Sequence, residues 1–420
     1  MIDNTLPISK SMQRLLAILF IVNSVYAVAW LGSYKYHNAL IELIINALFI
    51  GIAIVALTSS KLRNTSIYKV VTIYFIWMLL QSLRGLLGCE MYMDYRQWVD
   101  GTVMLSLPIL VYLFAFPPIV QYVLRKWLLW GGLIFFVFIL WNTGANCLYL
   151  APISLFACFL FELPKKWRFA IGAILIIWIG TVMDRANAIR SLVMILCALG
   201  FKYRKVVSDK MLRIVHHFFY VIPIVLLLLG YCGIFSFFQY LQEDNNGKHT
   251  QKVTRTDGSV QEVDVLGDTR TFIYSEVLTS SVKHNYVLWG RTPARGNDDY
   301  FFELLTSDGK GHSLRPNERH VNEVGHLNVY TWIGLVGIVL YSLIYLKASL
   351  LAVYHSRNAF MKFLGVFVAF RWAMGWIEEI NLFFVHSIML WMMIAMCMSD
   401  KFRKMSDAEF RVWFLNCLPQ

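Results

Sequence analysis

The sequence has few charged residues: only 15% of its 420 positions are Asp, Glu, Lys or Arg, while 58% are hydrophobic. Soluble domains carry about a quarter charged residues, so this balance excludes an ordinary soluble domain. Long apolar runs recur along the whole chain, and each is long enough to cross a bilayer as a helix. In lipid every backbone polar group must be satisfied within its own segment. The sequence therefore predicts an all-α polytopic membrane protein.

Acidic residues are also scarce relative to basic ones, with 26 Asp and Glu against 38 Lys and Arg and a net charge of +12. An excess of this size is typical of nucleic-acid binding, but its placement indicates otherwise. The basic residues cluster in short connections between apolar runs, at 61–69, 125–126, 165–168, 202–213 and 401–404. This placement follows the positive-inside rule of membrane proteins. We therefore expect membrane lipid and no nucleic acid among the partners.

Cysteine is absent from the one long polar segment, residues 239–325. The seven cysteines lie mostly in apolar segments, at Cys89, Cys147, Cys158, Cys197, Cys232, Cys397 and Cys417. This distribution predicts no disulfide framework. We expect these thiols to pack as small hydrophobic groups.

The apolar runs predict about twelve transmembrane helices, with one large extracytoplasmic loop between the ninth and the tenth. The predicted spans are 14–31, 38–58, 68–87, 101–123, 127–142, 147–162, 168–182, 190–201, 214–238, 326–346, 360–377 and 380–399. Ala27-Val28-Ala29 resembles a cleavage site, but the apolar run continues past it, which favours an uncleaved first span. If the N-terminus is cytoplasmic, every basic connection falls on the cytoplasmic side, as does the C-terminus. This divides the chain into a nine-span bundle (1–238), the loop (239–325), and three spans with a cytoplasmic tail (326–420).

The loop is longer than a passive connection requires, and it carries ten Lys and Arg against thirteen Asp and Glu. The alternation in Ser259–Val265 predicts a short hairpin. From Asp268, a plausible N-cap, apolar residues recur at Phe272, Ile273, Val277, Leu278 and Val282. This spacing predicts an amphipathic helix at the membrane interface, and Asn297–Glu318 is expected to be loop.

Arginines cluster near the predicted extracytoplasmic side, where they could bind phosphate in a forked geometry. Those of the loop are Arg270, Arg291 and Arg295; charged residues near the outer ends of spans are Arg84, Asp184, Arg185, Arg190, Arg371, Glu378 and Glu379. Snorkelling to the interface is the alternative for each of the latter. The segment Gly290–Gly296, GRTPARG, could bring its backbone close to a phosphate, or could simply be a turn. Neither a dinucleotide-binding glycine motif nor a P-loop is present, and we expect no cofactor.

His320, Glu323 and His326 recur at three-residue intervals where the chain re-enters the membrane. Their types suit a metal, but no fourth ligand accompanies them at a recognisable spacing, so we predict no metal site. General acid or base catalysis by Glu323, His326 or His320 is the functional interpretation. Helix capping and interface anchoring is the structural alternative.

These motifs resemble the bacterial O-antigen polymerase and O-antigen ligase family of envelope polysaccharide assembly. Asp184-Arg185-Ala186 is similar to the family's Ser-Arg-small step, and Arg270 with GRTPARG to its loop arginine and following turn. The segment before Gly334-Leu335-Val336-Gly337 is similar to its histidine motif, although Glu323 occupies the usual histidine position, eleven residues before the first glycine. The sequence Asn322–Gly325 resembles polymerase members of the family more than ligases.

The resemblance implies glycosyl transfer at the periplasmic face of the bacterial inner membrane. The donor would be a glycan on polyprenyl diphosphate, the acceptor a hydroxyl of another lipid-linked repeat unit, and the product O-antigen or capsular polysaccharide. Arg185, Arg270, Arg291 and Arg295 would bind the diphosphate, and other assembly proteins such as a chain-length regulator would be partners.

Three alternatives to this function stay open. A ligase would transfer the glycan to lipid A-core by the same chemistry. A transporter or flippase of the lipid-linked oligosaccharide predicts internal repeats, which the two halves do not show, and discontinuous helices at the membrane midplane. A membrane sensor or structural protein would need none of the loop motifs.

Overall fold

The computed structural model describes residues 6–32, 38–139, 146–181, 185–231, 250–254, 260–264, 269–299 and 318–419. Its helices are α1 (Lys10–Gly32), α2 (Ala39–Ser59), α3 (Lys69–Leu87), α4 (Tyr92–Leu105), α5 (Leu110–Phe114), α6 (Pro117–Lys126), α7 (Gly132–Ile134), α8 (Asn146–Tyr149), α9 (Ile153–Cys158), α10 (Lys165–Thr181), α11 (Arg185–Lys202), α12 (Asp209–Tyr231), α14 (Thr269–Lys283), α16 (Gly325–His355), α17 (Ala359–Met374), α18 (Val385–Met398), α19 (Asp400–Arg403) and α20 (Asp407–Leu415). The strands are β1 (Thr250–Thr254), β2 (Val260–Asp264), β3 (Asn297–Asp298) and β4 (Glu318–Arg319).

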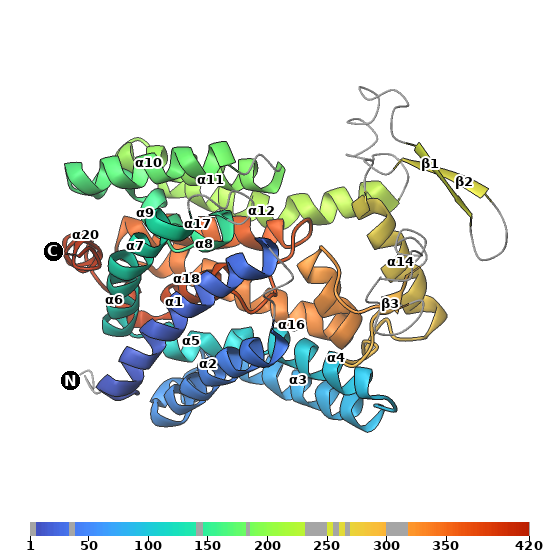
Figure 1. Cartoon of the computed structure of the whole chain (residues 1–420). Coiled ribbons are helices and arrows are strands. Elements are labelled where there is room, and N and C mark those ends of the chain that lie inside the picture. Colours follow the sequence, from blue (N-terminus) through green and yellow to red (C-terminus); the bar gives the residue numbers. More distant parts are fainter. Residues whose placement is uncertain are drawn as a thin grey trace.

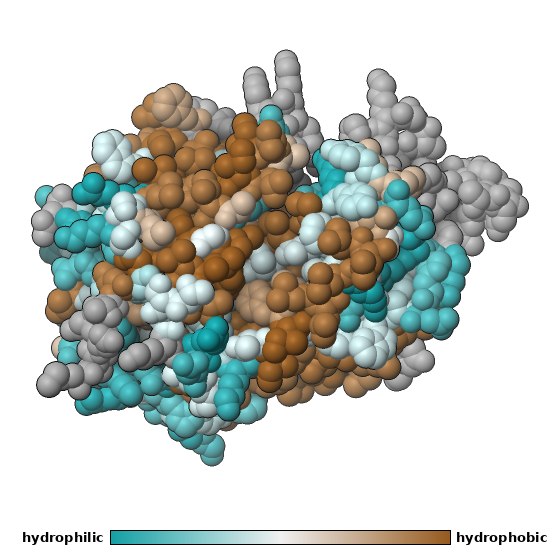
Figure 2. Space-filling view, turned by 90° about the horizontal axis from the view of Figure 1, so that it is seen from below, coloured by the Kyte–Doolittle hydropathy of each residue, from teal (hydrophilic) through white to brown (hydrophobic). Residues whose placement is uncertain are grey.

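Within these described ranges, seven helical segments are long and apolar enough to cross a membrane. They are Lys10–Val28, Ala39–Ser59, Lys69–Leu87, Tyr92–Phe114, Pro117–Phe138, Asp209–Gly230 and Gly325–His355, and the shorter Val385–Met398 is also apolar. Figure 2 shows apolar side chains across the middle of one face, with hydrophilic residues toward both ends. The all-α polytopic membrane class is confirmed, whereas the count of twelve spans stays a prediction.

The boundary expected between the fourth and fifth spans, near 123–127, is wrong by several residues. The chain breaks instead at Phe116, because Pro117 has no N–H to continue the preceding helix and suits the first position of α6. Ser399 and Trp413 donate to the carbonyls of Ala115 and Pro117 at 2.6 and 3.0 Å. Arg125 and Lys126 therefore lie in a continuous helical segment rather than in a connection.

The last helices form the centre of the bundle. Every residue of α18 is buried, and α18 packs against α16, α17 and α5. Helix α16 also packs against α3, and α17 against α12. Figure 1 shows both termini at one end of the bundle, with α14 and the β1–β2 hairpin at the opposite end.

The hairpin and the helix expected in the loop are confirmed, whereas the location of the helix at the membrane interface stays a prediction. Strands β1 and β2 pair antiparallel, with Thr250 opposite Asp264. Helix α14 buries Ile273 and Val277 on one face and exposes Leu278 and Val282. The expected N-cap, Asp268, lies outside the described residues. Strands β3 and β4 join the two ends of the segment expected to be loop.

Helix α16 is broken at Gly334, whose φ of 71° and ψ of −172° are not helical. The loop segment Val287–Thr292 supplies hydrogen bonds at this break. Arg291 and Thr292 donate their backbone N–H groups to the carbonyls of Thr331 and Trp332, at 2.7 and 3.1 Å, and Leu335 N–H donates to Val287 at 2.8 Å. Backbone groups freed by a break need such partners in a membrane protein. The break thus holds the GRTPARG motif against the bundle.

Candidate functional site

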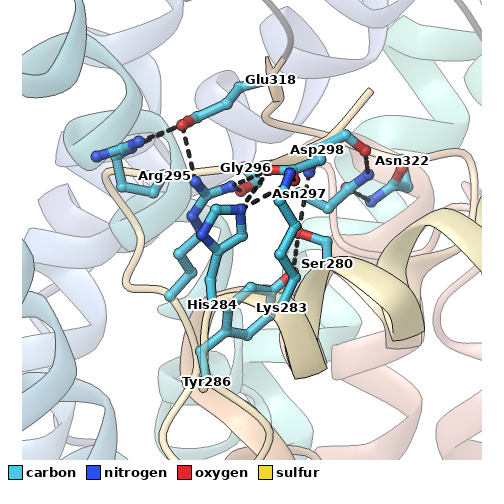
Figure 3. A network of polar contacts seen from close by, with 11 residues as sticks. Ser280, Lys283, His284, Tyr286, Arg295, Gly296, Asn297, Asp298, Glu318 and Asn322 are labelled. Atoms are coloured by element: carbon cyan, nitrogen blue, oxygen red, sulfur yellow. Dashed lines mark hydrogen bonds and ion pairs between the residues drawn. The ribbon is translucent and has the colours of Figure 1, made fainter. Parts of the chain in front are cut away.

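The loop arginines form a network with carboxylates, seen in Figure 3. Arg291 donates to Asp298 at 3.1 Å and lies 3.0 Å from Glu318. Arg295 donates two hydrogen bonds to Glu318, one of them at 3.0 Å. Forked contacts of this kind hold planar carboxylates tightly. Arg291 and Arg295 therefore share one carboxylate, and the network ties β3 to β4.

Asp298 is the second carboxylate of this network. Lys283 and His284 at the end of α14 both contact it, at 2.8 Å. Burial raises the pKa of Asp298, but the hydrogen bonds from Lys283 and His284 and the charge of Arg291 outweigh burial, so its pKa lies below the usual value. The ionised carboxylate thus joins α14 to the GRTPARG segment.

The other two predicted arginines belong to helix starts. Arg270 lies in the first turn of α14, and Arg185 is the first residue of α11. Their side chains lie outside the part that the structure describes. The predicted meeting of Arg185, Arg270 and Arg291 around one diphosphate stays a prediction.

The predicted catalytic residues His320, Glu323 and His326 point to different surroundings. His320 donates through Nε2 to the carbonyl of Pro293 at 2.8 Å and packs on Trp332. Burial lowers the pKa of His320 to about 4, so this ring is neutral at neutral pH. Glu323 is half exposed and lies 3.9 Å from Arg319.

His326 is fully buried at the start of α16. Its Nε2 donates to the carbonyl of Trp372 at 2.9 Å. Four aromatic rings surround it: those of Tyr341, Tyr345, Trp372 and Trp376. Among the described residues, no three His, Cys, Asp or Glu side chains are grouped as a metal site would require.

The connection between α17 and α18 brings several distant segments together. Its Glu378 carbonyl accepts the Gly325 N–H at 3.0 Å, and the Phe383 carbonyl accepts from Asn23 of α1, also at 3.0 Å. Tyr274 of α14 donates to the carbonyl of Trp376. The connection therefore links the loop, the first helix and the last helix.

A buried ion pair lies at the start of this connection. Arg371, near the end of α17, donates to Glu378, and both side chains are less than a tenth exposed. Arg190 of α11 lies 3.6 Å from the other oxygen of Glu378. Two guanidinium groups therefore share one carboxylate inside the bundle, where charged groups are costly and are typically functional.

Arg190 and Arg371 also line a cavity of about 40 Å³, large enough for about three water molecules. His386 of α18, Ser154 and Trp178 supply its other polar atoms, and the remaining lining consists of apolar side chains. Guanidinium groups in a partly apolar cavity bind anions such as phosphate strongly, because water competes little there. This cavity is the candidate functional site.

A series of hydrogen bonds runs from the loop network toward this cavity. The side chain of Asn297, next to Asp298, accepts from the side chain of Asn322 at 2.8 Å. The side chain of Asn328 accepts from the backbone N–H of Asn322 at 2.6 Å and donates to its carbonyl at 2.9 Å. Asn328 then donates to Glu379, the neighbour of Glu378. Burial raises the pKa of Glu379 to about 8, despite the hydrogen bonds that it accepts.

The sequence prediction includes Arg190, Arg371, Glu378 and Glu379 as charged residues near span ends, but not His386. The sequence does contain a signal for His386, because this residue interrupts the apolar run from Leu382 to Met393.

Comparison with known protein families, with curated proteins and with solved structures found no match for this chain.

Proposed function

We propose that this chain is a membrane glycosyltransferase that polymerises polyprenyl-diphosphate-linked oligosaccharide repeat units at the extracytoplasmic face. The observation that carries the proposal is the cavity beside Arg190 and Arg371. A departing diphosphate accumulates negative charge, and fixed guanidinium groups stabilise that charge without reorganising. The resemblance of the loop motifs to O-antigen polymerases supports the same reaction.

The electrostatics of the two arginine groups favour the cavity over the loop for the diphosphate. Arg291 and Arg295 already hold Asp298 and Glu318 in a forked geometry that joins two strands. A phosphate there would have to displace contacts that fold the loop. In the cavity, Arg190 lies 3.6 Å from Glu378 and lines the wall together with Arg371.

The lipid part of the substrate fits the same location. The cavity is lined by α9, α10, α11, α17 and α18 and contains many apolar side chains, so a polyprenyl tail would stay in hydrocarbon while its diphosphate enters. The loop, held at the break in α16, lies beside the incoming glycan in this arrangement.

The test is a strain that lacks this gene and carries variants of it. Arg371→Lys keeps a charge beside Glu378 but replaces the planar guanidinium, which can bind two phosphate oxygens at once, with a point charge. We expect about a 100-fold loss of polymerisation, seen as single-repeat glycans on a gel. Arg411→Lys is the matched control, because Arg411 is more than half exposed and pairs with Glu162 at 3.1 Å.

A ladder of normal length from Arg371→Lys, at normal protein level, would contradict the diphosphate site. Full-length glycan chains that accumulate unattached in the gene deletion would contradict polymerisation and indicate a ligase.

A further inference from the structure

Among the histidines that the structure describes, His386 is the one that lines the cavity. It lies in α18, is 7% exposed, and lines the cavity together with Arg190 and Arg371. A polar ring in the most buried helix of the bundle costs free energy unless it has partners or a function.

The hydrogen bonds around His386 define where its proton lies. Ser387 donates its hydroxyl proton to the carbonyl of Ile380 at 2.7 Å. A hydroxyl has one proton, so the same oxygen must accept from His386 Nε2, which is 3.1 Å away. The carbonyl of Glu379, which can only accept, also faces the ring. Nε2 therefore carries the hydrogen.

The other ring nitrogen is left with a lone pair. Nδ1 of His386 is buried and has no hydrogen-bond partner among the described residues. A protonated ring would bury a second N–H donor there without an acceptor, which is unfavourable. The neutral ring is therefore the form that fits, and its Nδ1 is suited to accept from a hydroxyl.

We propose that His386 is the general base of this enzyme, an assignment that rests on the proposed function. In this step Nδ1 takes the proton of the acceptor sugar hydroxyl, and the hydroxyl oxygen forms the new bond to the anomeric carbon of the donor. The bond between that carbon and the diphosphate oxygen breaks, and its electron pair leaves with the diphosphate beside Arg190 and Arg371. The proton passes from the imidazolium to the released diphosphate or to water.

The two other buried candidates are less well placed for this step. His326 also donates through Nε2, to Trp372, but aromatic rings enclose it and it does not line the cavity. His320 donates to Pro293 in the loop. Of these three histidines, His386 is the one that lines the cavity with the two arginines, and its buried Nδ1 has no hydrogen-bond partner among the described residues.

The test uses the full chain in lipid nanodiscs, with purified polyprenyl-diphosphate-linked repeat unit from the same strain as donor and acceptor. For His386→Gln we expect kcat to fall about 100-fold or more, with an unchanged KM. The acidic limb of the pH–rate profile should also disappear; Arg190, Arg371, Glu378 and Glu379 are the charged or titratable groups around the ring, and all stay in place. His217→Gln is the matched control, because His217 is exposed on α12.

A second variant guards against misfolding. Ser387→Ala leaves the imidazole in place but removes one of the two acceptors that fix its tautomer, so we expect about a tenfold lower kcat and a shifted acidic limb. If the wild-type protein is active and His386→Gln has the same rate and the same pH profile, the base assignment is wrong and the proposed function still stands. A higher KM together with a loss of thermal stability would also overturn it, in favour of a structural role. An inactive wild-type protein would overturn both proposals.

Discussion

Gly290 of the loop and Gly334 of α16 lie back to back. A Cβ atom added to Gly290 would lie 2.5 Å from the backbone nitrogen of Gly334, and one added to Gly334 would lie 2.4 Å from that of Gly290. Both glycines have positive φ, 76° and 71°. Two motifs far apart in the sequence thus meet through their main chains, in a contact that other residue types would prevent.

Replacing Gly290 with Ala should destabilise the protein by at least about 2 kcal/mol, because the new methyl group meets backbone atoms and the positive φ disfavours an L side chain. The thermal midpoint in detergent measures this effect. Gly172→Ala is the control, since a Cβ atom added to Gly172 in α10 would have no neighbour within 4 Å among the described residues. Equal midpoints for the two variants would contradict the close contact.

Trp77→Phe should lower stability by about 1–2 kcal/mol, because Trp77 donates to the carbonyl of Ile333 at the break in α16, at 2.9 Å. Trp130→Phe should have a smaller effect, since Trp130 is 54% exposed. Chemical denaturation in mixed micelles compares the two. A larger loss from Trp130→Phe would show that the break does not depend on this bond.

Asp298 should make the loop sensitive to acid. Its pKa is lower in the folded protein than its ordinary value of 3.8, so its stabilisation is full above that value and is lost as the pH falls through the folded pKa. Limited proteolysis between α14 and α16 at decreasing pH should reveal this loss. The protease should cleave the Asp298→Asn variant readily even at neutral pH. The control is Asp209→Asn, which changes an exposed residue that pairs with Lys362 and should behave like wild type.

His320 should act in a higher pH window. Its pKa of about 4 lies below the ordinary 6.5, so the neutral ring stabilises the fold fully above 6.5, and this contribution is lost as the pH falls through 4. The thermal midpoint of wild type should therefore fall relative to that of His320→Gln as the pH is lowered from 6.5 to 4. Parallel curves for the two proteins would rule out this contribution.

Much of the fold could be predicted from local features of the sequence. Long apolar runs indicate membrane helices wherever they occur, and the apolar spacing after Asp268 indicates α14, because both depend on neighbours along the chain. The break before Pro117 was within reach of the same reasoning, since proline cannot continue a helix. The basic pair Arg125 and Lys126 favoured a connection instead, but a basic pair can also lie in a helical segment.

The candidate site was less predictable, because its contacts join residues far apart in sequence. The type and location of Arg371 and Glu378 indicated function, but no spacing rule indicates that Arg190 would lie beside them. Arginine binds carboxylate and phosphate in the same geometry, so GRTPARG alone could not reveal that Asp298 and Glu318 hold its side chains. His386 was missed because its significance depends on the cavity that surrounds it.

The connection between α17 and α18 is held by residues from both ends of the chain, including Asn23 in the first helix. Membrane insertion proceeds from the N-terminus, so a partly synthesised chain cannot form the contact between Asn23 and this connection until Phe383 has been made. A chain that stops before Val385 would also lack His386. Premature termination before α18 should therefore remove the candidate site, because His386 and other residues of α18 line its cavity.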